Sequence, residues 1–257
     1  MVWRFFSRID PRRLALVTGT MPVFQLTHEP TFPNPMLATE DGLLAIGGDL
    51  TQARLIEAYG RGIFPWFGEE DPILWWSPDP RMVVFPEEFK VSRSLRRTAR
   101  GGRFTLTSDM AFEKVIAACA DVPRAGQDGT WITAEMEGAY VDLHRAGYAH
   151  SVECWEDDRL VGGLYGVSLG ACFFGESMFS LQPDASKLAL WALVEQARLW
   201  EFRMIDCQIH TDHLASLGAR SISREEFLRK LEDGLRAETR VGAWHLEAGI
   251  LDGSSTS

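Results

Sequence analysis

Three consecutive apolar segments of strand length constrain the fold of this 257-residue chain most strongly. They read AHSVECWE, RLVGGLYGVSL and ACFFGESMFS, and they begin at residues 149, 159 and 171. Only short turns separate them, at Asp157-Asp158 and at Gly170. Strands joined by such short turns pair antiparallel, so the sequence predicts an antiparallel meander here.

Helical and strand patterns flank this meander in a definite order. Before it, a basic helix and a strand over residues 103–109 precede helices over 110–120 and 134–146, the second capped by Thr133. After it, Asp184 begins a helix over 185–200. A strand over 203–210, a short helix over 211–218 and a helix over 224–236 then follow. This order resembles that of the GNAT acyltransferases, and it implies an α+β fold with a mixed sheet flanked by helices.

The first third of the chain is rich in Pro, Gly and Trp and predicts a separate, small N-terminal α/β domain over residues 21–85. Residues 86–248 then form the GNAT-like domain. We interpret residues 1–20 as a disordered extension or an incorrectly assigned start before Met21, and residues 249–257 as a flexible tail.

Composition and charge exclude several classes of protein. No apolar run approaches the roughly 18 residues of a membrane span, so we expect a soluble protein. The four cysteines form no CxxC pair, which predicts buried, inert thiols, no metal site and a cytoplasmic location. A net charge of −10 argues against non-specific coating of nucleic acid.

One segment is nevertheless strongly basic, because residues 90–103 carry six basic side chains and no acidic one. Four of these basic residues follow helical spacing and would share one helix face. They are Arg93, Arg96, Arg97 and Arg100. Either this face is only solvated, or it is a patch that binds phosphates on an otherwise acidic protein.

Glu176 lies in the middle of the apolar segment FFGESMFS. A buried carboxylate costs several kcal/mol unless it is paired, hydrogen-bonded or protonated. Taken alone, it is either a satisfied structural acceptor or a functional group.

An acetyl-CoA-dependent N-acetyltransferase is the alternative function for a chain with this order of elements. Such enzymes carry an R/Q-x-x-G-x-G/A loop whose backbone N–H groups hold a pyrophosphate at a helix N-terminus. The corresponding segment is SLQPDASK, which has no glycine and contains Asp184. Acetyl-CoA is therefore a poor candidate for the acyl donor.

The chain closely resembles the bacterial leucyl/phenylalanyl-tRNA–protein transferase family from about Phe32 to Phe227. The resemblance rests on long, ordered blocks: GLLAIGGDL, AYGRGIFPWF, PILWWSPDPR, VSRSL, GTWIT, AHSVECW, LVGGLYGV, FFGESMFS, DASK, IDCQ and HLASLGA. It implies transfer of Leu, Phe or Met from aminoacyl-tRNA to the N-terminal Arg or Lys of a protein, which marks that protein for degradation by the N-end rule. The ester is already activated, so no cofactor is expected. A non-catalytic binder of the tRNA 3′ end is a further alternative, against which the intact Asp206–Gln208 pair argues.

The resemblance also assigns catalytic roles to Asp206 and Gln208 in IDCQ. Being two apart on a strand, they are expected to project from one face. In one interpretation Asp206 orients Gln208, which contacts the attacking amine; in another, Asp206 mainly places the cationic acceptor. A structural alternative pairs Asp206 with an arginine inside the sheet.

The remaining family roles concern the tRNA. Trp66, Trp131 and Glu176 match residues around the terminal adenosine. The side chain of the transferred amino acid would occupy an apolar pocket, and the basic face would bind the tRNA body. The pocket residues are Leu164, Phe173, Met178, Leu193 and Ile205. Under strict alternation Phe173 and Met178 would face opposite ways, so sharing the pocket requires a bulge near Gly175.

We expect the protein to be a monomer.

Two positions depart from the family pattern. Leu181 and Asp184 stand where the family usually has an arginine and an asparagine, so the local charge near the donor or acceptor differs. Lys187 is a basic residue that could compensate.

Overall fold

The computed structural model describes residues 23–121 and 132–251 of the chain. The extension expected over residues 1–20 and the predicted adenosine contact Trp131 lie outside these described residues.

A small sheet forms the N-terminal part of the described chain. Its strands have the order β1-β2-β4-β3, and helix α1 follows β2 in sequence. Thr51 occupies the N-cap position of α1, but its hydroxyl donates to Asp49 and makes no capping bond. The bounds are β1 Phe24–Leu26, β2 Leu43–Gly47, α1 Gln52–Gly60, β3 Phe64–Pro65 and β4 Leu74–Trp76, with a short 3-10 helix at Pro35–Leu37.

The larger sheet has seven strands in the order β11-β5-β10-β9-β8-β7-β6. Strands β7, β8 and β9 form the predicted antiparallel meander, and β10 pairs parallel to β9. This mixed sheet confirms the expected α+β class. The bounds are β5 Arg81–Val84, β6 Phe104–Ser108, β7 Ala149–Glu156, β8 Arg159–Leu169, β9 Cys172–Ser180, β10 Met204–Gln208 and β11 Arg220–Ile222.

Strand β5 lies before residue 85, where the sequence analysis places the domain boundary, yet it pairs with β10 and β11 of the larger sheet. The apolar run that includes this strand therefore crosses from the small sheet to the large one. This connection brings Arg81 into the larger sheet, next to β10.

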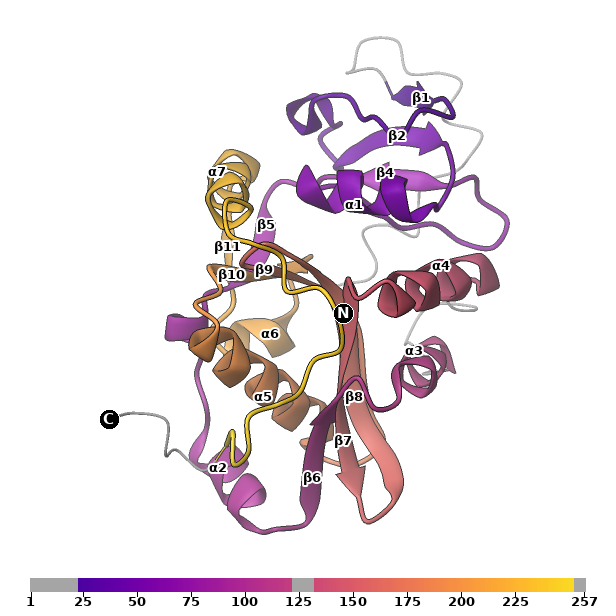
Figure 1. Ribbon diagram of the computed structural model, residues 1–257. Helices are drawn as coiled ribbons and strands as arrows, with labels where there is room; N and C mark the ends of the chain where they lie inside the picture. Colours follow the sequence, from indigo (N-terminus) through magenta and orange to yellow (C-terminus); the bar gives the residue numbers. More distant parts are fainter. Residues whose placement is uncertain (1–22, 122–131, 252–257) are drawn as a thin grey trace.

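Helices cover both faces of the larger sheet (Figure 1), with α3 and α4 on one side and α5 on the other. Ser92, Thr133, Thr211 and Ser223 accept N-capping bonds, which confirms the cap expected at Thr133. The bounds are α2 Arg93–Arg100, α3 Phe112–Asp121, α4 Ala134–Arg145, α5 Ala185–Leu199, α6 Asp212–Ser216 and α7 Arg224–Gly234, with a short 3-10 helix at Pro86–Glu88.

Asp184 does not cap α5 with its side chain, contrary to the prediction. It stands at the N-cap position in a left-handed conformation (φ 68°). Its carboxylate instead accepts from Lys187 at 2.8 Å and from the Thr98 hydroxyl of α2 at 3.2 Å. Asp184 therefore joins α2 to the start of α5.

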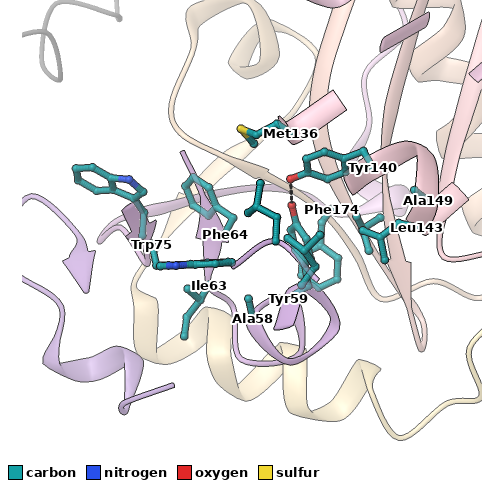
Figure 2. Close-up of a cluster of buried hydrophobic side chains, with 14 of the residues drawn as sticks. Ala58, Tyr59, Ile63, Phe64, Trp75, Met136, Tyr140, Leu143, Ala149 and Phe174 are labelled. Atoms are coloured by element: carbon teal, nitrogen blue, oxygen red, sulfur yellow. Dashed lines mark hydrogen bonds between the residues drawn. The ribbon is translucent and has the colours of Figure 1, made fainter. Parts of the chain in front are cut away.

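One continuous apolar core joins the small sheet, α1, α3 and α4 to the larger sheet. Figure 2 shows its centre, where Tyr59 of α1 and Tyr140 of α4 form a short hydroxyl–hydroxyl bond beside Phe174 of β9. A second core packs α5 and α2 against the opposite face. The small sheet and the larger sheet thus contribute jointly to one core.

The C-terminal segment after α7 belongs to the second core. Trp244 and Ile250 are buried there, so the tail expected from residue 249 is packed at its start. In the described part of the chain, no helix has the length and apolar character needed to cross a membrane.

Candidate active site

A cavity of about 340 Å³ opens between β8, β9, β10, α5 and α6. All five residues predicted to form the amino-acid pocket line it: Leu164, Phe173, Met178, Leu193 and Ile205. Glu176 and Gln208 line the same cavity, which gives an otherwise apolar space a polar side. The structure thus brings the predicted pocket and two of the predicted polar residues to one place.

The strand register explains why the apolar lining residues meet. Leu164 of β8 lies directly opposite Met178 of β9, and Phe173 of β9 lies opposite Ile205 of β10. The β8–β9 register shifts because Tyr165 pairs with Ser177 whereas Gly166 pairs with Gly175. The predicted bulge is therefore present, with Glu176 as the extra residue.

Glu176 is 9% exposed and is satisfied by hydrogen bonds. Gln208 Nε2 donates to its Oε1 at 2.8 Å, and the Tyr140 hydroxyl donates to its Oε2 at 2.8 Å. Tyr140 also bonds to Tyr59. The Glu176 carboxylate thus links the cavity to the core beneath the small sheet. Its hydrogen bonds explain how a carboxylate is accommodated in an apolar strand.

Burial dominates the electrostatics of this carboxylate. It raises the pKa of Glu176 to about 7, although the donors from Tyr59, Tyr140 and Gln208 act in the opposite direction. Burial and the nearby Glu176 charge raise the pKa of Tyr140, which therefore stays a hydroxyl donor. Glu176 consequently changes charge near neutral pH.

Asp206 is fully buried and pairs with Arg81 of β5. Arg81 Nε donates to its Oδ1 at 2.9 Å, and a terminal nitrogen of Arg81 donates to its Oδ2 at 2.6 Å. The guanidinium lies between the rings of Phe64 and Phe227, at 4.7 and 4.6 Å from their centroids. The structural alternative raised from the sequence, an ion pair with an arginine inside the sheet, is therefore present.

Gln208 departs from regular strand geometry. Its φ is +62°, and the β10–β5 register shifts between Asp206 and Gln208. The backbone N–H of Gln208 donates to Asp206 Oδ1 at 2.8 Å. Strand alternation predicted that Asp206 and Gln208 project from one face, and this argument was wrong for Gln208. A bulge held by Asp206 directs the Gln208 side chain toward Glu176 instead.

The small sheet completes the cavity wall. Phe64 and Trp66 line it, and the Trp66 ring packs edge-on against Trp76 at 5.7 Å between centroids. Trp66 is half-buried, which leaves part of its ring accessible for stacking. Thr211 and His213 around the start of α6 form another part of the wall.

The basic face of α2 is exposed. Within the described chain, none of its four arginines forms an ion pair, and Arg96 lies over the Trp191 ring of α5 at 5.6 Å. Leu95 is the buried anchor of this helix. The face therefore presents unneutralised positive charge next to the helix that lines the cavity.

Both departures from the family pattern lie close to α5. Leu181 is 64% exposed just after β9. Hydrogen bonding by Lys187 lowers the pKa of Asp184, which stays ionised and neutralises this lysine. Lys187 therefore does not supply the free charge that the arginine would have provided.

Sequence reasoning missed three residues of the site. Arg81, Tyr59 and Tyr140 are far from the IDCQ and GESMF segments in sequence and meet them only through the tertiary fold. A signal existed for Arg81, since an arginine in an otherwise apolar strand needs a buried acidic partner. No comparable signal distinguished the tyrosines from ordinary core residues.

Comparison with known proteins gives the family. The model described as "Leucyl/phenylalanyl-tRNA protein transferase" matches residues 83–232, and the model of the corresponding N-terminal domain matches residues 48–79. The chain belongs to the leucyl/phenylalanyl-tRNA–protein transferase family. As a member of this family, it is an aminoacyltransferase.

The chain matches several curated relatives over nearly their whole length. Proteins named leucyl/phenylalanyl-tRNA–protein transferase from Anaeromyxobacter sp. (strain Fw109-5) and Myxococcus xanthus are 58% and 54% identical to the chain. These matches cover 89% and 87% of this chain and 97% of each relative. A relative of the same name from Desulforapulum autotrophicum is 52% identical over 87% of the chain and 98% of its own length.

Proposed function

We propose that the protein transfers Leu or Phe, and also Met, from aminoacyl-tRNA to the N-terminal Arg or Lys of an acceptor protein. The observation that carries this proposal is one cavity with an apolar lining and a hydrogen-bonded Glu176–Gln208 pair at its side. The apolar part suits the side chain of the transferred residue. The polar part suits the ester and the attacking amine, and we assign the reacting groups to it.

The reaction needs alignment and proton transfer more than chemical activation. The acceptor's α-amino nitrogen forms a bond to the ester carbonyl carbon, and the bond from that carbon to the tRNA 3′ oxygen breaks. The amine loses a proton and the departing oxygen gains one. An α-amino group has a pKa of about 7.7–8.0, so a useful fraction is neutral near pH 7.

Gln208 is the proposed catalytic residue, because its side chain lines the cavity. With its Nε2 committed to Glu176, its amide oxygen is the atom that accepts a hydrogen bond from the attacking amine. Asp206 is fully buried and bound to Arg81, so it acts as a positioning residue that holds the Gln208 backbone. This arrangement favours the interpretation in which Asp206 orients Gln208.

The donor's terminal adenosine is proposed to stack on Trp66, with Trp131 as the second predicted aromatic contact. Stacking on an aromatic side chain contributes roughly 1–3 kcal/mol per base. Glu176 faces the same cavity and belongs to the proposed adenosine site. Its hydrogen bond to Gln208 supports an adenosine site next to the reacting amine.

The α2 arginines are proposed to bind phosphates of the tRNA body. Their exposure, together with the absence of ion pairs to them in the described chain, supports this role over a merely solvated face. Phosphate contacts position a nucleic acid without reading its bases, as an enzyme that accepts several tRNAs requires. A monomer in the cytoplasm, without a cofactor, completes the proposal.

An acetyl-CoA donor is less well supported. Asp184 stands directly before α5 and stays ionised, which opposes a pyrophosphate at that helix N-terminus. No glycine lies between Ser180 and Lys187 to allow close backbone approach.

The test supplies labelled leucyl-tRNA and phenylalanyl-tRNA with peptides that begin in Arg, Lys or Ala. We expect transfer to the Arg and Lys peptides and little to the Ala peptide. Absence of transfer from either donor to any peptide, or acetylation of the same peptides from acetyl-CoA, would overturn the proposal.

A further inference from the structure

The cavity is lined on one side by the ring of Phe173, and this ring is itself supported from outside the cavity. Phe173 is 1% exposed and lines the proposed amino-acid pocket. A Cβ atom on Gly166 would lie 2.6 Å from Cε1 of Phe173, so the ring rests on a bare stretch of β8 backbone. Trp244 of the C-terminal segment is a further neighbour, at 5.8 Å between ring centroids.

Trp244 is fixed in place by several independent contacts. Its ring stacks on His150 at 3.8 Å between centroids and 8° between planes. Its backbone N–H donates to Asp109 Oδ2 at 2.7 Å, and its carbonyl accepts from the Ser108 hydroxyl at 2.9 Å. Asp109 Oδ2 also bonds His150 Nδ1 at 2.8 Å.

These contacts make a rigid connection between the C-terminal segment and the cavity lining. His150 of β7 lies opposite Gly166 of β8, so the residue that stacks on Trp244 neighbours the β8 backbone on which the Phe173 ring rests. Trp244 is 4% exposed and has no contact with the cavity itself. It also lies beyond residue 232, where the family match ends.

We propose that Trp244 is a specificity-determining residue, which sets the size of the amino-acid pocket by holding the Phe173 ring. This inference rests on the proposed function, because it identifies what limits the donor side chain. The bicyclic indole blocks movement of the Phe173 ring away from the cavity toward residue 244. A smaller residue at 244 leaves space into which Phe173 shifts, and the cavity becomes deeper.

The depth of the cavity should affect large donors more than small ones. We expect a leucine side chain to make fewer contacts with the Phe173 end of the cavity than phenylalanine and bulkier side chains do. Apolar pockets discriminate between substrates by about 10- to 200-fold for each methylene-sized change. A shift of the Phe173 ring caused by a substitution at residue 244 should give a fraction of this discrimination. We therefore expect a change in donor preference and not a uniform loss of activity.

The experiment measures kcat/KM with leucyl-, phenylalanyl- and tryptophanyl-tRNA for the full chain and its variants. Trp244→Leu creates the larger space, and Trp244→Phe is a milder change that retains an aromatic ring if Trp244→Leu does not fold. In Trp244→Phe we expect the Phe/Leu ratio to rise about three- to tenfold through KM, with tryptophanyl transfer becoming measurable.

The matched control is Trp200→Phe. Trp200 packs against Trp244 at 4.8 Å between ring centroids, and within the described residues no ring contact joins it to Phe173. Trp200→Phe should lower the melting temperature comparably to Trp244→Phe while leaving the Phe/Leu ratio unchanged.

A folded Trp244→Phe variant with an unchanged ratio, or a ratio that shifts equally in Trp200→Phe, would overturn the inference alone. A wild-type chain that transfers neither leucine nor phenylalanine would instead overturn the proposed function, and the inference with it.

Discussion

Asp206 Oδ1 accepts the backbone N–H of Gln208 at 2.8 Å, and this bond stabilises a left-handed backbone conformation in a strand. A non-glycine residue in that region is strained by about 1–3 kcal/mol and persists only where its surroundings hold it. The same carboxylate is bound by Arg81 through both oxygens. The ion pair therefore fixes the direction of a side chain that lies one residue beyond the bulge.

Removing the Asp206 carboxylate should cost both stability and activity. Asp206→Ala leaves the buried Arg81 guanidinium without its partner, which typically destabilises a protein by about 3–5 kcal/mol. Transfer should be lost at the same time, since Gln208 loses the acceptor for its backbone N–H. Urea unfolding and a transfer assay measure the two effects separately.

The double variant Arg81→Met/Asp206→Leu separates the effect on stability from the effect on activity. Replacing a buried ion pair with apolar residues of similar volume is often neutral or stabilising, so much of the stability should return. Activity should stay low, because the bond to Gln208 is still missing. A stable, fully active double variant would show that Asp206 has no positioning role.

Glu176 should make folding stability depend on pH. Its pKa rises from 4.5 to about 7 on folding, so between these values the folded state holds a proton that the unfolded state has released. The favourable contribution is complete below about pH 4.5 and is lost as the pH rises through about 7. Urea unfolding at about pH 5 and pH 8 should show a larger decrease in the wild type than in Glu176→Gln, and parallel decreases would contradict the raised pKa.

Activity should show the opposite dependence on the same group. The ionised carboxylate accepts hydrogen bonds from Gln208 and Tyr140 on separate oxygens, whereas the protonated form loses part of this capacity. The transfer rate of the wild type should therefore rise through about pH 7. In Glu176→Gln the transfer rate should rise with pH only as the acceptor amine loses its proton. Identical pH–rate profiles for the wild type and Glu176→Gln would exclude Glu176 as a contributor.

Narrowing the cavity from α5 should change donor choice directly. Leu193→Phe places a larger side chain in a space of about 340 Å³. Transfer of phenylalanine should fall about tenfold or more relative to leucine, because overpacking excludes the larger donor first. Competition between the two charged tRNAs measures the ratio, and an equal loss for both would place the amino-acid side chain elsewhere.

Reversing charge on α2 should affect only donors that carry the tRNA body. Arg96→Glu/Arg97→Glu should weaken binding of leucyl-tRNA strongly and reduce its salt dependence, with little effect on an aminoacyl-adenosine donor. Reversing Lys114 and Arg145 in α3 and α4 is the matched control, since these helices cover the other face of the sheet. Equal losses for both donors in the α2 variant would contradict the assignment.

The sequence predicted those features that depend on local pattern. The meander, the Thr133 cap and the lining of the cavity followed from periodicity, turn residues and family resemblance. Even the bulge near Gly175 could be predicted, because strict alternation would have separated Phe173 from Met178.

Features that depend on tertiary contact could be predicted only in part or not at all. An arginine partner for Asp206 was raised as an alternative, but the sequence did not identify Arg81, which lies 125 positions away. The positive φ of Gln208 arises from its bond to Asp206 inside a register shift, where simple alternation gave the wrong geometry. Asp184 looked like a cap, but its carboxylate is bound by Lys187 and Thr98 instead.

Gln208 is central to the proposed mechanism, because it is the group that contacts the attacking amine. The most direct test is single-turnover transfer of labelled leucine from leucyl-tRNA to an Arg-initiated peptide, with wild-type protein and Gln208→Ala compared at equal saturation with donor. Gln208→Ala removes one donor to Glu176 but leaves Tyr140 bound to it, so the fold and donor affinity should persist. We expect transfer by the wild type and a rate at least about 100-fold lower in Gln208→Ala. A rate in Gln208→Ala equal to that of the wild type would contradict this role of Gln208.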